Sequence, residues 1–264
     1  MENKFAKNTF IKRLRTMLTV DFRRMLSMPF FYIVIGSSFV IPILILVMTT
    51  MMEGTTTTDP QGNQIPMQGF ETVWQAISAR SDAPMSMDLT GMCNMNIMYF
   101  LIPVLACIFI SGDFKSGYSK NLFTVRSKKS DYVISKTVVC FFGGALMLLA
   151  FFVGALLGGA ISKLSFSTGG ASSWQVFLCL LSKIAMVGVF VPIIVLVSCI
   201  LKQRTWLSIL FSMVASMLLF TMIQIITPLD QNIINTLVCI IGALVFSAGL
   251  GAVSNVILKN TSLV

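Results

Sequence analysis

The segment from Ser111 to Lys136 reads SGDFKSGYSKNLFTVRSKKSDYVISK and mixes basic residues with large apolar ones. Leu122 and Phe123 stand among lysines, which makes the segment more apolar than a solvated loop requires. A short amphipathic helix here would present an apolar contact with basic neighbours to another molecule. The pattern of this segment therefore predicts that it recognises a soluble partner. The alternative interpretation, a loop whose charges only fix the orientation of the chain, remains open.

No catalytic constellation accompanies this segment. The chain has no histidine and lacks the GxSxG, HExxH and GxxxxGK[ST] motifs, so ATP hydrolysis by the usual means is not predicted. Its apolar runs carry essentially no carboxylates, which argues against an intramembrane enzyme and against an ion-driven pump. The six cysteines form no CxxC pair, and the 18 methionines have no histidine beside them to suggest a copper site. We expect the chain itself to bind no metal and no cofactor.

The composition predicts an integral membrane protein. Of the 264 residues, 56% are hydrophobic and only 11% are charged, whereas soluble domains are roughly a quarter charged. The apolar residues fall into runs of about twenty, which is the length that crosses a bilayer as a helix. Gly154 and Gly158, four residues apart, are expected to let two such helices approach closely. We expect an all-α protein with six transmembrane helices at about 29–52, 93–112, 133–162, 176–201, 204–227 and 232–257.

The positions of Lys and Arg predict the orientation. The net charge of +9 comes from basic residues that flank the apolar runs, so it does not indicate nucleic-acid binding. Seven of them precede the first run and six lie between the second and third, whereas the alternate loops hold only Arg80 and Lys163. By the positive-inside rule both termini are cytoplasmic. Basic residues near the bilayer surface also predict contact with membrane lipid.

The chain is expected to form one membrane domain with short flanking segments. Its parts are a cytoplasmic N-terminus at 1–28, six spans at 29–257 with an external loop at 53–91 and a cytoplasmic segment at 113–131, and a cytoplasmic tail at 258–264. Residues 5–27 are predicted to form an amphipathic helix on the membrane surface. Residues 70–77 are predicted to form a short helix in the external loop. The first apolar run is too long for a signal peptide, so we expect it to stay in the mature protein.

Lys183 is the one charge predicted to lie close to, or within, a span. An unpaired ammonium in hydrocarbon costs at least a few kcal/mol. If the fourth helix begins near Ile184, Lys183 reaches the outer surface along its own stem. In the alternative interpretation it lines an outer vestibule and attracts an anionic substrate or lipid, with Asn96 and Gln224 as further polar residues on a substrate path. Most other polar residues of the spans are expected to bond between helices.

The segment after the second span resembles the permeases of the type-2 ABC exporter family, including the small permeases of antimicrobial-peptide and lantibiotic export and immunity systems. In that family an acidic residue precedes a Gly-Thr-like pair, a short helix ending in Leu-Leu or similar, a basic residue, and a lysine at the start of the third span. The resemblance covers the whole chain, because four other features also agree with the family. They are the predicted amphipathic helix at residues 5–27, which we call the entry helix, the six spans, the cytoplasmic termini and the length of the chain. Tyr118 stands where the family more often has Thr. The matching residues are Asp113, Gly117, Asn121, Leu122, Phe123, Arg126, Lys128 and Lys136.

The resemblance implies a subunit without a nucleotide site of its own. Such a subunit pairs with a second permease, identical or different, and with separate cytoplasmic ATP-binding subunits that carry ATP and Mg. Closure of those subunits would push on the segment after the second span and tilt the helices between inward- and outward-facing states. The residues expected to contact the ATP-binding subunit are Gly117, Lys120, Asn121, Leu122, Phe123 and Arg126.

The expected function is ATP-dependent export of an amphipathic peptide, antibiotic or lipid-like molecule across the plasma membrane of a bacterium. Apolar spans without carboxylates suit such cargo better than ions. The second candidate is a membrane scaffold or sensor subunit that holds a cytoplasmic partner without moving anything, and a membrane enzyme comes third. A neighbouring gene for an ATP-binding subunit would favour export, whereas a neighbouring kinase or protease gene would favour sensing.

Overall fold

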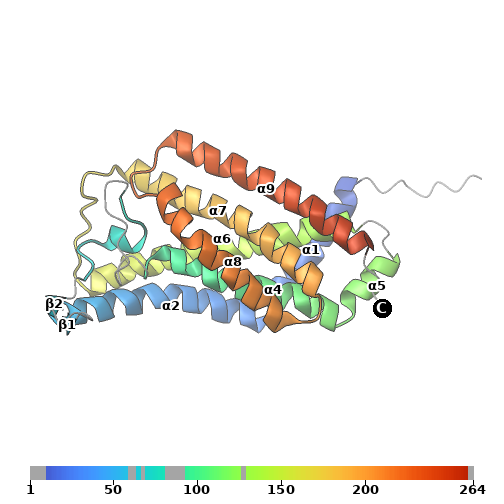
Figure 1. Cartoon of the computed structure of the whole chain (residues 1–264), viewed down its shortest axis with the longest axis horizontal. Coiled ribbons are helices and arrows are strands. Elements are labelled where there is room, and N and C mark those ends of the chain that lie inside the picture. Colours follow the sequence, from blue (N-terminus) through green and yellow to red (C-terminus); the bar gives the residue numbers. More distant parts are fainter. Residues whose placement is uncertain (1–9, 59–63, 67–68, 81–92, 126–128, 261–264) are drawn as a thin grey trace, which may run out of the picture.

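The computed structural model describes residues 10–58, 64–66, 69–80, 93–125 and 129–260. Long helices lie side by side in a bundle (Figure 1). The elements are α1 (Phe10–Ser27), α2 (Pro29–Met52), β1 (Thr56–Thr58), β2 (Gln64–Pro66), the short 3₁₀ helices η1 (Val73–Ala76) and η2 (Met95–Ile97), α4 (Met98–Lys115), α5 (Tyr118–Val125), α6 (Ser130–Ile161), α7 (Ser173–Leu201), α8 (Thr205–Ile226) and α9 (Ile233–Asn260).

The six apolar helices occur where the sequence predicts spans. Helices α2, α4, α6, α7 and α9 are each long and apolar enough to cross a bilayer, and α8 contains a shorter apolar stretch, Thr205–Phe220. Their ends differ from the predicted ends by a few residues. The expected all-α class is therefore confirmed. A small antiparallel hairpin is added to it, in which Thr56 of β1 lies opposite Pro66 of β2.

The bundle has two distinct ends (Figure 1). We call the end with α1 and α5 the basic end and the end with β1 and β2 the hairpin end. At the hairpin end, η1 falls within the predicted short helix at 70–77. The indole of Trp74 on η1 donates a hydrogen bond to the carbonyl of Phe166, 2.8 Å away. The segment between α2 and α4 therefore packs onto the loop between α6 and α7.

Helices α2 and α6 pack closely because α6 presents glycines to α2. A Cβ atom built on Gly154 would collide with the carbonyl oxygen of Phe39, and one built on Gly158 would lie 2.9 Å from the Cα atom of Ile43. Small residues allow this approach of two backbones, and close packing drives helix association where water is absent. The predicted role of these two glycines is confirmed.

Helices α8 and α9 expose large apolar side chains on the outside of the bundle. Examples are Phe211, Leu218, Ile241, Leu244 and Val245, each more than half exposed. A water-soluble monomer rarely exposes so much apolar surface. In a bilayer this surface contacts lipid or another apolar protein surface. The buried core lies inside the bundle, where α4, α6 and α7 meet, and includes Tyr99, Ile102, Met147, Phe151 and Phe190.

Candidate functional site

A buried ion network ties three helices together at the basic end. The ammonium of Lys136 on α6 lies 2.9 Å from Asp21 Oδ1 on α1 and 2.7 Å from Asp113 Oδ2 on α4. Arg24 on α1 completes the network, with Nη2 2.6 Å from Asp113 Oδ1. The side chains of Asp21, Asp113 and Lys136 are fully buried. Two carboxylates thus face two cations, and the network is neutral as a whole.

Hydrogen bonds support the two carboxylates. The hydroxyl of Ser135 donates to Asp21 Oδ2 at 2.6 Å, and the hydroxyl of Tyr132 donates to Asp113 Oδ2 at 3.2 Å. The ammonium of Lys136 also lies 3.9 Å from the centre of the Phe109 ring. Ions removed from water are tolerated only when their partners replace the lost hydration. The network is therefore a fixed joint between α1, α4 and α6.

Arg24 connects the network to α5. Its guanidinium lies over the ring of Tyr118, 3.9 Å from the ring centre. Burial lowers the pKa of Arg24, whereas the charge and hydrogen bond of Asp113 raise it, and the net shift of the pKa is upward. Arg24 therefore stays charged. A second ion pair between α1 and α6, Arg13 Nε with Asp131 Oδ2 at 3.3 Å, fixes α1 further.

Helix α5 forms an elbow between α4 and α6. The chain turns at Gly117, whose φ of +73° favours glycine. The hydroxyl of Ser119 donates to the carbonyl of Asp113 at 3.0 Å. The ring of Phe123 meets Tyr132 edge to face, with the ring centres 5.2 Å apart. Both ends of α5 are thus held by residues that neighbour or belong to the ion network.

The predicted contact residues divide between two faces of α5. Lys120 and Asn121 are exposed, whereas Leu122 and Phe123 are half-buried and pack against the core. Gly117 lies at the turn. Arg126 and Lys128 lie outside the described residues, as do residues 5–9 of the predicted entry helix and residues 261–264 of the predicted tail. The apolar pair thus connects α5 to the bundle, and the polar residues are the ones presented outward.

Asp21 was not among the predicted site residues. Its signal was present: Asp21 shares the buried face of α1 with Met17 and Met25, which lie four residues before and after it. An acidic residue on the apolar stripe of an otherwise basic helix indicates a buried partner. The same network explains why α4 runs past the predicted end at 112. Asp113 is neutralised by Lys136 and so does not need to leave the helix for water.

A second polar cluster lies toward the hairpin end around Lys183. The ammonium donates to Asn96 Oδ1 at 2.6 Å and to Thr227 Oγ1 at 3.1 Å. Lys183 lies ten residues after Ser173, the first residue of α7, and is fully buried. The expectation that it reaches the outer surface is therefore wrong, because α7 begins too early for its stem to reach the helix end. Of the predicted polar residues, Asn96 is joined to Lys183, while Gln224 lies half-buried on α8.

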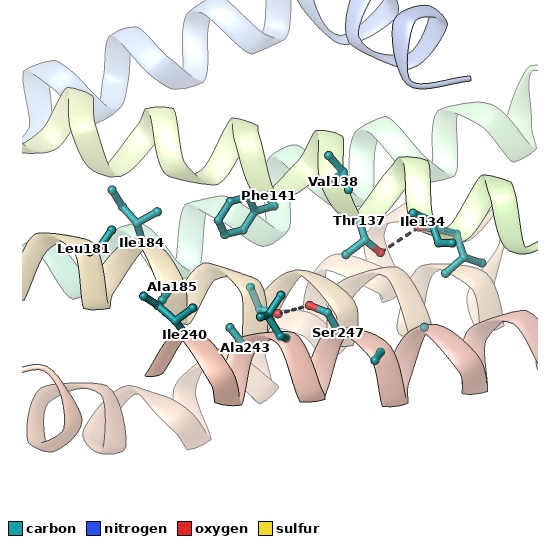
Figure 2. Close-up of a pocket in the computed structure, with 15 residues that line it drawn as sticks. Ile134, Thr137, Val138, Phe141, Leu181, Ile184, Ala185, Ile240, Ala243 and Ser247 are labelled. Atoms are coloured by element: carbon teal, nitrogen blue, oxygen red, sulfur yellow. Dashed lines mark hydrogen bonds between the residues drawn. The ribbon is translucent and has the colours of Figure 1, made fainter. Parts of the chain in front are cut away.

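An apolar pocket of about 450 Å³ opens between α6, α7 and α9 (Figure 2). Its two labelled hydroxyls are already engaged: Thr137 donates to the carbonyl of Val133 at 2.9 Å and Ser247 to that of Gly188 at 2.8 Å. The lining therefore offers its occupant apolar contacts and little hydrogen bonding. Among the described residues, no group of three or more acidic or cysteine side chains is arranged to hold a metal ion.

Comparison with known proteins identifies the family. Residues 22–219 match the ABC-2 family transporter proteins. The chain belongs to this family. Neither the curated proteins nor the solved structures gave a match.

Membership of the ABC-2 family makes this chain a permease subunit of an ABC transporter and a multi-pass membrane protein. It also implies association with an ATP-binding subunit and dimerisation. The resemblance seen in the sequence is thus confirmed at the level of the family. The matched region includes the ion network apart from Asp21, and all of the α5 elbow.

Proposed function

We propose that the chain is the membrane subunit of an exporter that moves an amphipathic peptide, antibiotic or lipid-like molecule out of a bacterial cell. Separate subunits on the cytoplasmic side bind ATP and Mg and supply the energy. Both termini and the basic end face the cytoplasm in this proposal, because the positively charged loops gather there. The partner permease is a second copy or a related chain.

The observation that carries the proposal is the coupling of α5 to the ion network. A force applied to the exposed face of α5, at Lys120 and Asn121, reaches α6 through the Phe123–Tyr132 contact. It reaches α4 through the Ser119 hydroxyl bonded to Asp113. Buried ion pairs resist distortion, so α1, α4 and α6 are expected to move together rather than shear apart. The elbow is therefore suited to convert closure of the ATP-binding subunits into a tilt of the bundle.

The apolar pocket of Figure 2 supports the cargo class. An apolar pocket without free hydrogen-bond donors suits hydrocarbon or aromatic groups better than sugars or ions. Its position between helices that expose apolar surface agrees with entry from the bilayer. We propose that it receives the apolar part of the cargo during transport.

Lys183 is the proposed contact for an anionic part of the cargo, with Asn96 and Gln224 on the same path. None of the ion pairs between described residues includes Lys183. Among the described atoms, the side-chain nitrogen of Asn96 is buried without a hydrogen-bond partner. An ammonium that is bonded only to neutral oxygens is stabilised by a nearby anion, which can reach it when the helices separate during transport. Lys183→Met should preserve folding, because it removes an uncompensated buried charge, and should reduce transport; unchanged transport would exclude this role.

Co-purification and ATP turnover test the proposed function. The chain is co-expressed with its ATP-binding subunit, and Lys120→Glu and Asn121→Arg are introduced together on the exposed face of α5. We expect less co-purified ATP-binding subunit. Phe123→Ala should instead leave assembly intact and reduce the stimulation of ATP turnover by cargo, because it weakens the packing of α5 on Tyr132 and the core and leaves the exposed face of α5 unchanged.

Lys259→Glu is the matched control, since this exposed cation lies at the same end but on α9. It should change neither assembly nor turnover. Normal assembly and normal coupled turnover in all the α5 variants would reject the elbow as the contact. Normal assembly without any cargo-dependent turnover, in the unaltered complex, would favour the scaffold function instead.

A further inference from the structure

A basic pocket lies where the end of α4, the start of α5 and the turn between α7 and α8 meet. Its volume is about 430 Å³. Four cations line it, Lys115, Lys120, Lys202 and Arg204, and the described residues of its lining include no acidic side chain. Lys115, Lys120 and Arg204 are exposed, so their charges are accessible. The pocket is therefore complementary to an anionic group.

An open apolar groove of about 590 Å³ continues from this pocket. The two hollows share Lys115 and Arg204, and the groove then follows apolar side chains of α4 and α8 that include Ile108 and Ile209. Trp206, which is 68% exposed, lines the groove next to the shared cations. Tryptophan is enriched at the level of lipid head groups, where an apolar ring meets a polar surface. The exposed Trp206 thus agrees with a pocket at the head-group level and a groove that extends toward the hydrocarbon.

We propose that the basic pocket and the apolar groove together bind one anionic phospholipid of the surrounding bilayer. Its phosphate occupies the pocket and one acyl chain follows the groove between α4 and α8. Basic pockets between transmembrane helices recognise anionic head groups in this way. An acidic protein surface satisfies the cations equally well but has no use for the adjoining groove, so the observations favour a lipid. The site shares Lys120 with the proposed contact for the ATP-binding subunit, but it does not depend on the identity of the cargo or on the direction of transport.

The bound lipid links separate parts of the fold. Lys120 belongs to α5 and Arg204 precedes α8, so one phosphate between them joins the elbow to the turn between α7 and α8. Those segments carry cations that repel one another at short range. An anion in the pocket removes that repulsion. The lipid composition of the bilayer thereby affects how firmly the elbow is held against α8.

Quenching of Trp206 fluorescence measures the proposed binding. The full chain is reconstituted in phosphatidylcholine vesicles that contain a minor fraction of dibrominated phosphatidylglycerol or, separately, of dibrominated phosphatidylcholine. The difference in emission between the unaltered chain and a Trp206→Phe variant gives the signal of Trp206 alone, separate from that of Trp74 and Trp174. Since one neutralised cation contributes a factor of about five in affinity, we expect the brominated anionic lipid to quench at roughly fivefold lower mole fraction. The preference should shrink as the salt concentration rises.

The double variant Lys115→Gln/Arg204→Gln should abolish the preference, and Arg204→Gln alone should reduce it. Both side chains are exposed, so the fold should tolerate these changes. Lys259→Gln, an exposed cation outside both hollows, should retain the full preference. Equal quenching by the two lipids in the unaltered chain overturns the proposal, as does a preference that persists in the double variant. A third outcome combines equal quenching by the two lipids in the unaltered chain with loss of the co-purified ATP-binding subunit in the double variant. That outcome would assign the pocket to the protein partner and would also overturn the proposal.

Discussion

Lys136→Met removes the cation at the centre of the buried ion network while keeping an unbranched side chain of similar length. In the unaltered chain its ammonium lies 2.9 Å from Asp21 Oδ1 and 2.7 Å from Asp113 Oδ2, and all three side chains are fully buried. The variant leaves two buried carboxylates with only Arg24 to balance them. A site that was neutral then carries one uncompensated negative charge.

The expected loss of stability follows from that charge. Removing one partner of a buried ion pair costs about 3–5 kcal/mol, because the remaining ion stays out of water. For chains of this size, about 1 kcal/mol lowers the midpoint of thermal unfolding by roughly 2–4 °C. We therefore expect the midpoint of the Lys136→Met variant to fall by about 6–20 °C.

Thermal unfolding in detergent, followed by tryptophan fluorescence, measures this loss. The double variant Asp21→Asn/Lys136→Met is the decisive comparison, because it removes one charge of each sign and keeps the Arg24–Asp113 pair. We expect it to be more stable than Lys136→Met alone. Lys120→Met, which removes an exposed cation at the same end, is the control and should leave the midpoint nearly unchanged.

Two results would exclude a coupled, stabilising role of the ion network. One is a Lys136→Met variant that unfolds at the same temperature as the unaltered chain. The other is a double variant whose loss equals the sum of the losses of Asp21→Asn and Lys136→Met, since residues in one network are expected to be coupled.

Two further predictions concern packing and orientation. Gly154→Ala should destabilise the chain by about 1–3 kcal/mol, because the new methyl group meets the backbone of α2. Gly242→Ala, with nothing within 4 Å of its Cβ position, should be neutral or slightly stabilising in the same thermal assay. Equal effects of the two substitutions would contradict the close approach of α2 and α6. In a chain without the half-buried Cys93, a membrane-impermeant maleimide applied to intact cells should label Thr56→Cys and not Asn121→Cys, and the reverse pattern would invert the proposed orientation.

The helices were predictable because lipid imposes a simple rule on the sequence. A span must satisfy its backbone internally and remain apolar for about twenty residues, so the runs that become α2 and α6 are visible without a structure. The close approach of α2 and α6 was also visible, from Gly154 and Gly158. The hairpin of β1 and β2 was not, because a two-stranded ribbon of polar residues leaves no strong pattern.

The candidate site was predicted only in part. Asp113 and Lys136 were singled out by their resemblance to a family motif, but their contact with each other depends on how α4 and α6 pack. Asp21 is separated from Lys136 by 115 residues, and nothing local to either residue indicates the pairing. The inward packing of Phe123 was not predictable for the same reason. An apolar residue on a short helix can contact either a partner protein or the core of its own chain. Only the position of Tyr132 in the folded structure shows that Phe123 packs inward.

Photo-crosslinking from α5 measures directly whether its exposed face contacts the ATP-binding subunit. A benzophenone maleimide is attached to Asn121→Cys in a chain without Cys93, and Thr56→Cys in the same background is the control. The complex with the ATP-binding subunit is then illuminated in inverted membrane vesicles that mild detergent has permeabilised. We expect a covalent product with the ATP-binding subunit from position 121 and none from position 56. A product from position 56, with none from position 121, would show that the ATP-binding subunit does not bind at α5.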